Sequence, residues 1–202
     1  MSEPASAKPR PGYGTPHPDV LAVLGSASPV ATQRIVWQGG LLLDLAAYHP
    51  LLPLPSEFVT SVRCLVQVDD QVVVCETPDG PHIWPGGRRM PGESYEATAR
   101  REVHEETGRR IEERLLRPLG FLHYRIVDGR PDNYPYPHPD FLQVVYATRI
   151  DGSEPASGAH WADVEGWEQG YHLHPLRDLD DLQVSAPQRA FLDLLVRQAR
   201  PF

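Results

Sequence analysis

The chain has 202 residues, of which 41% are hydrophobic and 23% charged, a mixture typical of one globular domain with a well-buried core. Its formal net charge of -8 argues against a large nucleic-acid-binding surface, because such surfaces need clustered lysine and arginine. No stretch has the length and apolar character of a membrane span, and the run from Val20 to Gly25 is too short for a secretory leader, so we expect a cytoplasmic protein without a membrane partner.

Prolines divide the chain into three parts. Residues 1–18 contain five prolines among small polar residues, and we expect them to form a flexible arm. Residues 19–52 are more apolar and form an N-terminal extension. After the linker from Pro50 to Pro55, residues 53–202 form the main domain.

Two structures remain open for the N-terminal extension. Arg34 to Trp37 and Leu41 to Leu45 flank Gly39-Gly40, a pattern that favours a hairpin. Leu41 to Tyr48 is alternatively a short helix.

The main domain begins with a predicted hairpin. The apolar runs Val59 to Val68 and Val72 to Cys75 are separated by Asp69-Asp70-Gln71, which favours a turn between two strands. Cys64 and Cys75 fall on these two strands, where core packing is the favoured interpretation. A disulfide between them is compatible with the sequence but is not implied by it.

A predicted helix follows, and it carries three glutamates on one face. Ser94 can cap its start, and Gly108 can end it. Glu102, Glu105 and Glu106 have the spacing i, i+3 and i+4, so they repel one another unless a cation lies between them. Their hard oxygen ligands favour Mg²⁺ or Mn²⁺, while zinc is disfavoured because no paired cysteines or closely spaced histidines surround them.

Two further charged residues belong to this pattern. Arg101 has no acceptor atom and cannot bind the metal, but its guanidinium can hold a neighbouring carboxylate by two hydrogen bonds. Glu93 lies at the junction of loop and helix, from which its side chain can turn back towards the site.

Beyond the helix, Leu119 to Val127 and Phe141 to Ile150 are predicted strands, separated by the loop from Asp128 to Asp140. Strands on both sides of a helix indicate a mixed α/β sandwich. Tyr134 and Tyr136 in the loop either stack on a nucleobase or decorate its surface, and both interpretations remain open.

The last part of the chain is less informative about function. Trp161 lies in an irregular stretch, where it is a further candidate for substrate contact, although a place in the core or in a lid is favoured. Pro187 to Arg200 places Phe191, Leu194 and Leu195 at helical spacing, which predicts a helix docked on the sheet.

The segment from Gly87 to Arg109 resembles the Nudix box, G-x5-E-x7-R-E-U-x-E-E-x-G-U, in which U is aliphatic. It follows the sequence Trp84-Pro85-Gly86-Gly87, as a glycine loop before the helix. The last position of the pattern is not met, since Arg109 stands there. All other positions of the pattern are met, by Gly87, Glu93, Arg101, Glu102, Val103, Glu105, Glu106 and Gly108.

The resemblance implies an α/β/α sandwich and a Mg²⁺-dependent pyrophosphohydrolase that cleaves a nucleoside diphosphate linked to another moiety. It implies that Glu102, Glu105 and Glu106 carry the metal, that Arg101 orients them and that Glu93 supports the site. Glu102 and Glu105 are the leading candidates for the general base.

The resemblance leaves the substrate and the partners open. Tyr124 lies near the position of a tyrosine in dinucleotide-polyphosphate hydrolases of the family, but ordinary strand packing explains it equally. Similar enzymes use an N-terminal extension to form homodimers. The alternative function is a nucleotide-sensing module without turnover, and the complete set of box charges favours the enzyme.

Overall fold

The computed structural model describes residues 15–37, 40–78, 80–128, 136–152 and 170–199, and the statements below refer to these residues. In chain order the elements are α1 (Pro18–Gly25), β1 (Ala31–Trp37), β2 (Leu41–Tyr48), η2 (Ser56–Phe58), β3 (Val59–Val68), β4 (Gln71–Thr77), β5 (Gly80–His82), β6 (Gly86–Arg88), α2 (Tyr95–Thr107), η3 (Glu113–Leu115), β7 (Arg117–Asp128), β8 (Asp140–Ile150), β9 (Gly170–Pro175), η4 (Leu176–Asp181) and α3 (Ala186–Ala199).

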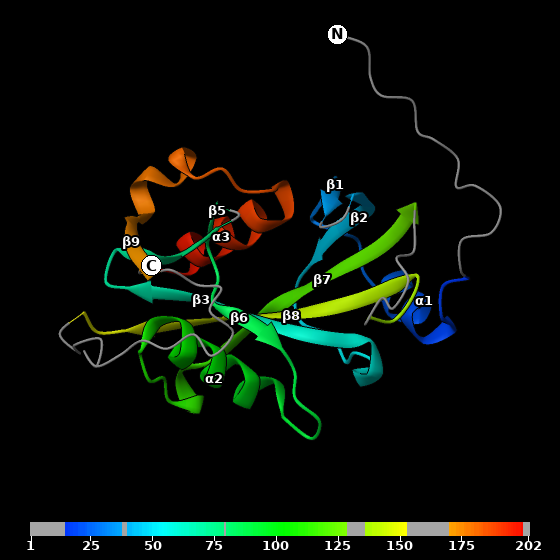
Figure 1. Ribbon diagram of the computed structural model, residues 1–202, viewed down its shortest axis with the longest axis horizontal. Helices are drawn as coiled ribbons and strands as arrows, with labels where there is room; N and C mark the ends of the chain where they lie inside the picture. Colours follow the sequence, from blue (N-terminus) through cyan, green and yellow to red (C-terminus); the bar gives the residue numbers. More distant parts are fainter. Residues whose placement is uncertain (1–14, 38–39, 79, 129–135, 153–169, 200–202) are drawn as a thin grey trace, which may run out of the picture.

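A mixed sheet runs through the centre of the molecule (Figure 1). The main strand order is β1-β2-β7-β8-β3-β4-β5, while β6 pairs with β3 and β9 pairs with β4. β3 and β8 are parallel, whereas β1-β2, β2-β7 and β7-β8 are antiparallel. Helix α2 packs on one face of the sheet and α3 on the other, which confirms the expected α/β sandwich with a mixed sheet.

The two faces of the sheet form two hydrophobic cores. Successive strand residues point to opposite faces, so Cys64 and Val66 of β3 pack beneath α2 with Val103. Leu65, between them, packs on the other face in the cluster that contains Phe191 of α3. Because burial of one large apolar side chain contributes roughly 1.5–3 kcal/mol, several such contacts fix each helix on the sheet.

The hairpin predicted at the start of the main domain is present. β3 has the predicted bounds, β4 pairs with it antiparallel, and Asp69 adopts a φ of 52° in the turn between them. Cys64 and Cys75 are fully buried in one core cluster and do not form a disulfide, so the packing interpretation is confirmed.

The N-terminal extension adds a hairpin to this sheet. β1 pairs antiparallel with β2, and β2 pairs antiparallel with β7. The alternative helix from Leu41 to Tyr48 is wrong, because alternate side chains of β2 are buried against the core while its backbone joins the ladder of β7. Residues 41–48 therefore belong to the same sheet as the strands of the box-bearing domain.

The predicted elements after the box are also present, with small shifts at their ends. β7 and β8 contain the predicted strands, and α3 corresponds to the predicted last helix. Among the described residues, no helix has the length and apolar character needed to cross a membrane.

Candidate active site

The glutamates of the box are positioned by α2 and the loop before it. The Ser94 hydroxyl accepts a hydrogen bond from the amide of Ala97 and caps the helix, as predicted. Gly108 ends the helix in the left-handed conformation, with φ of 69°. These local contacts fix the first and last turns, so Glu102, Glu105 and Glu106 project from a helix of defined length.

Arg101 lies at the centre of three carboxylates. Its Nε is 2.9 Å from Glu93 Oε1, and its Nη2 is 3.1 Å from Glu93 Oε2. Its Nη1 donates to Glu102 Oε1 at 2.7 Å and to Glu105 Oε2 at 2.9 Å. Nη2 also donates to the carbonyl of Arg88 at 2.8 Å, which ties the glycine loop to the helix. The guanidinium thus holds the loop glutamate and two helix glutamates in one cluster.

The carboxylates in this cluster differ in environment. Hydrogen bonds from Arg101, with help from the Met90 amide and the Thr98 hydroxyl, lower the pKa of Glu93 to about 2 despite partial burial. Burial raises the pKa of Glu102 above its ordinary range, although Arg101 opposes that shift. Glu93 is therefore firmly ionised, while Glu102 lies in the less hydrated part of the cluster.

A side chain at position 87 would displace the carboxylate of Glu102. A β-carbon on Gly87 would lie 2.5 Å from Glu102 Oε1 and 2.6 Å from Oε2, closer than van der Waals contact allows. The amide of the preceding glycine, Gly86, donates a hydrogen bond to Glu106 Oε1 at 3.0 Å. The double glycine thus brings backbone against two box carboxylates.

Glu106 is held by a different set of contacts from Glu102 and Glu105. Besides the Gly86 amide at Oε1, its Oε2 lies 3.6 Å from the Sγ atom of Cys75. The structure therefore brings Glu102 and Glu105 together at Arg101, and it turns the Glu106 carboxylate towards β4 and the glycine loop.

Two arginines outside the predicted set belong to the strand and the glycine loop around the site. Arg63 of β3 donates from Nη1 to the carbonyl of Gly86, and its charge favours the ionised forms of both Glu102 and Tyr124. Arg88 of β6 has its Nε 3.2 Å from the hydroxyl of Tyr136 and its guanidinium carbon 5.4 Å from the centre of that ring. Arg63 was missed as a site residue because it stands inside an apolar strand.

An aromatic cluster continues from these arginines. Trp37 of β1 stacks on Tyr136 and Phe141 with ring centres 5.9 and 5.7 Å apart. Tyr124 stacks on Phe141 at 4.7 Å, and its buried hydroxyl donates to Gln143 Oε1 at 3.1 Å. The cluster joins the N-terminal extension, two strands of the sheet and the end of the loop between them.

Of the three aromatic residues predicted to contact substrate, Tyr136 is in this cluster, while Tyr134 and Trp161 lie outside the described residues. Trp37 and Phe141 were missed as site candidates. Only the antiparallel ladder from β1 through β2 to β7 and β8 brings them together. The one indication in the sequence was a tryptophan beside a predicted glycine turn.

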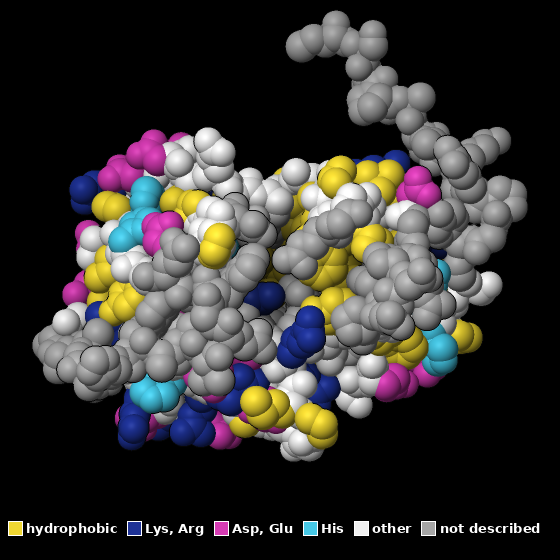
Figure 2. Space-filling model, viewed as in Figure 1, with side chains coloured by type: hydrophobic (Ala, Val, Ile, Leu, Met, Phe, Trp, Pro, Cys, Tyr) yellow, Lys and Arg dark blue, Asp and Glu magenta, His cyan; other side chains and the backbone are white. Residues whose placement is uncertain are grey.

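The surface is hollowed on this side of the molecule. Figure 2 shows arginine or lysine side chains near the centre of the view, next to hydrophobic side chains. A groove of about 380 Å³ has Arg88 and Tyr136 in its wall, together with Met90 and Glu57. The groove therefore begins where the glycine loop meets the aromatic cluster.

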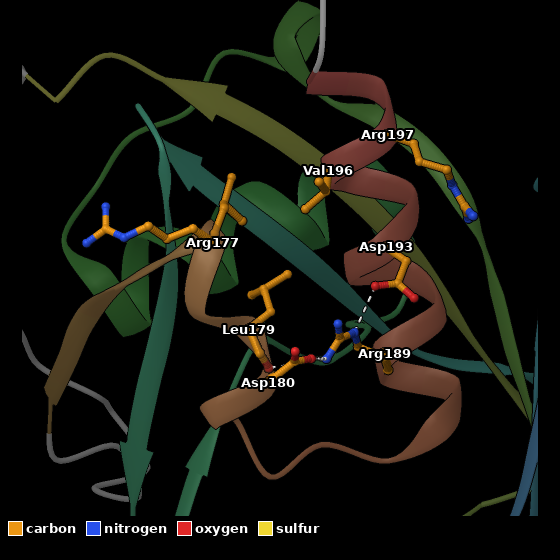
Figure 3. A pocket seen from close by; sticks show the side chains of 8 residues that line it. Arg177, Leu179, Asp180, Arg189, Asp193, Val196 and Arg197 are labelled. Atoms are coloured by element: carbon orange, nitrogen blue, oxygen red, sulfur yellow. Dashed lines mark hydrogen bonds and ion pairs between the residues drawn. The ribbon is translucent and has the colours of Figure 1, made fainter.

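A second groove, of about 290 Å³, lies between η4 and α3 (Figure 3). Arg189 in its wall donates to Asp180 at 2.6 Å and to Asp193 at 2.8 Å. None of the box glutamates lines this groove. The ion pair between Arg189 and Asp180 connects α3 to η4, so we assign the groove a structural role.

Comparisons with known proteins agree with the geometry. The model of the NUDIX domain matches residues 57–195, which is more than half of the chain. No curated protein matches the chain.

Among solved structures, the Bacillus subtilis pyrophosphohydrolase BsRppH is 18% identical with a TM-score of 0.53, and the match covers 82% of this chain and 94% of that one. The NUDIX domain of Shewanella oneidensis NrtR, solved with ADP ribose, is 14% identical with a TM-score of 0.51, covering 72% and 93%. These two structures share the fold, and the family match covers the box, the strands from β3 to β9 and most of α3. The chain therefore belongs to the Nudix family and is a hydrolase that acts on phosphoanhydride bonds.

Proposed function

We propose that this hydrolase cleaves the pyrophosphate linkage of a nucleoside diphosphate joined to another moiety, with Mg²⁺ or Mn²⁺ as cofactor. The observation that carries the proposal is the position of Arg88, whose carbonyl accepts a hydrogen bond from Arg101 Nη2 at 2.8 Å and whose Nε lies 3.2 Å from the hydroxyl of Tyr136. Carboxylates, a cationic side chain and aromatic rings thus follow one another along one surface. This order fits a metal-bound pyrophosphate with a nucleoside at one end.

The donor set fits a hard divalent cation. One nitrogen of Arg101 reaches oxygens of both Glu102 and Glu105, so these oxygens lie close enough to share an ion, and Glu106 follows on the same helix. Carboxylate oxygens are the ligands that Mg²⁺ and Mn²⁺ prefer. Bound by these glutamates, the cation would neutralise phosphate oxygens and lower the pKa of an attacking water.

The protein groups around that site have separate tasks. Arg101 holds Glu102 and Glu105 in position, and Glu93 fixes the guanidinium from the opposite side. Glu102 and Glu105 are the candidates to accept the proton of the water. The side chain of Glu105 is 33% exposed, which leaves it accessible to a water molecule.

The two added arginines suit the phosphate groups. A guanidinium binds phosphate oxygens by paired, charge-assisted hydrogen bonds. Arg63 lies beside Glu102, and Arg88 lies between the glycine loop and Tyr136. In the proposed complex they balance phosphate charge that the metal leaves uncompensated.

The aromatic cluster suits the nucleobase. Base stacking on an aromatic side chain is worth about 1–3 kcal/mol, and it tolerates different bases because each has a π-face. Trp37 and Tyr136 are only partly buried and can offer ring surface to a ligand. Tyr134 and Trp161 remain proposed contacts of the same kind.

A substrate screen tests the proposal. Purified protein would be incubated with nucleotides, sugar nucleotides, dinucleotides and ADP-ribose, with and without Mg²⁺, and the products resolved by chromatography. We expect metal-dependent release of a nucleoside monophosphate or of phosphate products from at least one of them. Nucleotide binding without turnover under all conditions would contradict the proposal and favour the sensing module.

We also propose that the N-terminal extension supports a homodimer. β1 is an edge strand of the described sheet, and Val36 on it is 73% exposed. Exposed sheet edges are ready to pair with another strand. Light scattering on wild type and Val36→Lys should give a dimer that the substitution weakens, and a monomeric wild type would refute the proposal.

A further inference from the structure

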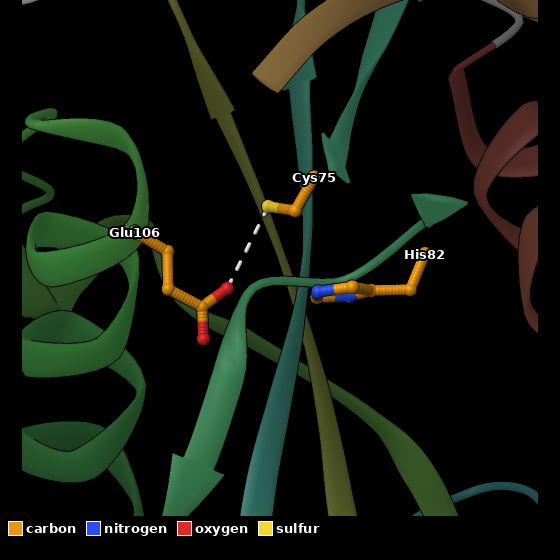
Figure 4. Close-up of side chains that lie close together, drawn as sticks. All are labelled: Cys75, His82 and Glu106. Carbon is orange, nitrogen blue, oxygen red and sulfur yellow. Dashed lines mark hydrogen bonds between the residues drawn. The ribbon is translucent and has the colours of Figure 1, made fainter. Parts of the chain in front are cut away.

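Three side chains that can bind a transition metal meet behind the glycine loop. Cys75 of β4, His82 of β5 and Glu106 of α2 each have one ligand atom within 4.8 Å of those of the other two (Figure 4). Cys75 and His82 are directly opposite each other in the antiparallel pair of β4 and β5, so their side chains lie on the same face. Glu106 approaches from the helix that covers this face.

The distance between the sulfur of Cys75 and a carboxylate oxygen of Glu106 fits tetrahedral coordination of one metal ion. The Sγ of Cys75 and the Oε2 of Glu106 are 3.6 Å apart. In a tetrahedral zinc site, bond lengths of about 2.3 Å to sulfur and about 2.0–2.2 Å to oxygen place those two ligands about 3.5 Å apart. The pair therefore already has the separation that a shared zinc ion requires.

His82 and Glu106 are oriented by contacts behind them. Nδ1 of His82 lies 3.2 Å from the carbonyl of Trp84. A metal-binding histidine usually donates its second ring N–H to such an acceptor, which leaves the other nitrogen as the ligand. Glu106 is held in the same way, because its Oε1 accepts the Gly86 amide while Oε2 faces the thiol.

The donor set also distinguishes this cluster from the carboxylates at Arg101. A thiolate, an imidazole and a carboxylate together favour zinc and similar late transition metals over magnesium. Binding would displace the thiol proton of Cys75 to solvent, and the charges of thiolate, carboxylate and divalent ion then sum to zero. Neutrality matters here because Cys75 is fully buried and Glu106 is 5% exposed. His82 is half-buried, so the ion has a route from solvent.

We propose that Cys75, His82 and Glu106 form a binding site for a zinc-class divalent cation, and that this cation inhibits hydrolysis by withdrawing Glu106 from the magnesium site. The inhibitory part rests on the proposed function, whereas the binding part does not. The box alone did not suggest this site, because only Glu106 belongs to the box, while Cys75 and His82 come from the two strands before it.

Cobalt is the probe for binding. Co²⁺ added to metal-free protein should produce thiolate-to-cobalt charge-transfer absorption in the near ultraviolet, and added Zn²⁺ should abolish it. Cys64→Ser is the matched control, because Cys64 is the other fully buried cysteine and lies on the neighbouring strand. We expect Cys64→Ser to keep the absorption and Cys75→Ser to lose it. His82→Ala, at a half-buried position, should weaken cobalt binding about tenfold or more and tests the site even when a buried cysteine variant fails to fold.

Two results would overturn the binding site: no charge-transfer absorption in the wild type, or unchanged cobalt affinity in His82→Ala.

The proposed inhibition by zinc is measured separately, as Mg²⁺-dependent turnover at increasing Zn²⁺ concentration. His82→Ala should keep its magnesium-dependent turnover and lose most of the inhibition. Equal inhibition of wild type and His82→Ala would refute the coupling. Cobalt binding without turnover of any substrate would refute the proposed function and leave the binding site standing.

Discussion

Arg101 binds both carboxylate oxygens of Glu93, with Nε 2.9 Å from Oε1 and Nη2 3.1 Å from Oε2. The remaining nitrogen of the guanidinium, Nη1, donates to Glu102 and Glu105. A planar fork with fixed donors can meet three carboxylates at once only from one orientation. Glu93 sets that orientation from the loop, so the position of the helix glutamates depends on a residue eight positions before the arginine.

Arg101→Lys should lower kcat by about tenfold or more. Lysine keeps the positive charge, but its ammonium group cannot reproduce the paired contacts that hold Glu93, Glu102 and Glu105 together. Arg100→Lys is the matched control, since the neighbouring arginine instead contacts the Ile111 carbonyl and Glu113. Steady-state kinetics on the substrate found in the screen would measure both. Equal kcat in the two variants would contradict the proposed role of the paired guanidinium contacts.

The low pKa of Glu93 should make its contribution to stability depend on pH. Its folded-state pKa of about 2 lies below the ordinary value of 4.5, so folding favours the ionised form. The stabilisation is complete above about pH 4.5 and is lost as the pH falls towards 2. Urea unfolding of wild type and Glu93→Gln between pH 7 and pH 3 should therefore give free energies of unfolding that converge at the acidic end.

Glu57→Gln, at an exposed position, is the control for that series and should follow the wild type throughout. A difference between wild type and Glu93→Gln that stays constant from neutral to acidic pH would show that Glu93 stabilises the protein by some means other than its charge.

The helix with its caps was predictable because the information is local. Ser94, Gly108 and the spacing of the glutamates lie within one helix and its two ends, where short-range hydrogen bonds decide the conformation. The β3-β4 hairpin was predictable for the same reason, since two apolar runs flank a short polar turn.

The remainder of the site depends on contacts between distant segments. Trp37 reaches Tyr136 and Phe141 only through the register of a ladder that begins in the N-terminal extension. The direction of the Glu106 carboxylate depends on Cys75 in β4 and on the amide of Gly86. Periodicity places a side chain on a helix face, but it does not determine which neighbouring strand that side chain meets.

Glu105→Gln and Glu106→Gln should each lower turnover by on the order of a hundredfold or more while preserving the fold, because each removes charge that stabilises the transition state. Isothermal titration with Mg²⁺ should show weaker binding in both variants. Glu112→Gln is the control, since Glu112 is exposed after the helix and pairs with Arg114. Unchanged metal affinity and turnover in both test variants would rule out these glutamates as metal ligands.

The aromatic cluster should govern substrate affinity more than turnover. The pyrophosphate is common to all candidate substrates, so discrimination must come from surfaces that contact the base or the other moiety. Removing one stacking surface worth about 1–3 kcal/mol should raise KM about fivefold or more with a smaller change in kcat, because stacking binds substrate and transition state alike.

Trp37→Ala and Tyr136→Ala test this expectation at the two partly buried rings. Thr32→Ala, at an exposed position on the same strand as Trp37, is the control and should leave KM unchanged. Comparison of substrates with and without a base completes the test: the two aromatic variants should lose affinity only for the base-containing substrate. An equal loss for both would assign the rings to the packing of the extension, and substrate recognition would then have to lie elsewhere, with Trp161 as the next residue to replace.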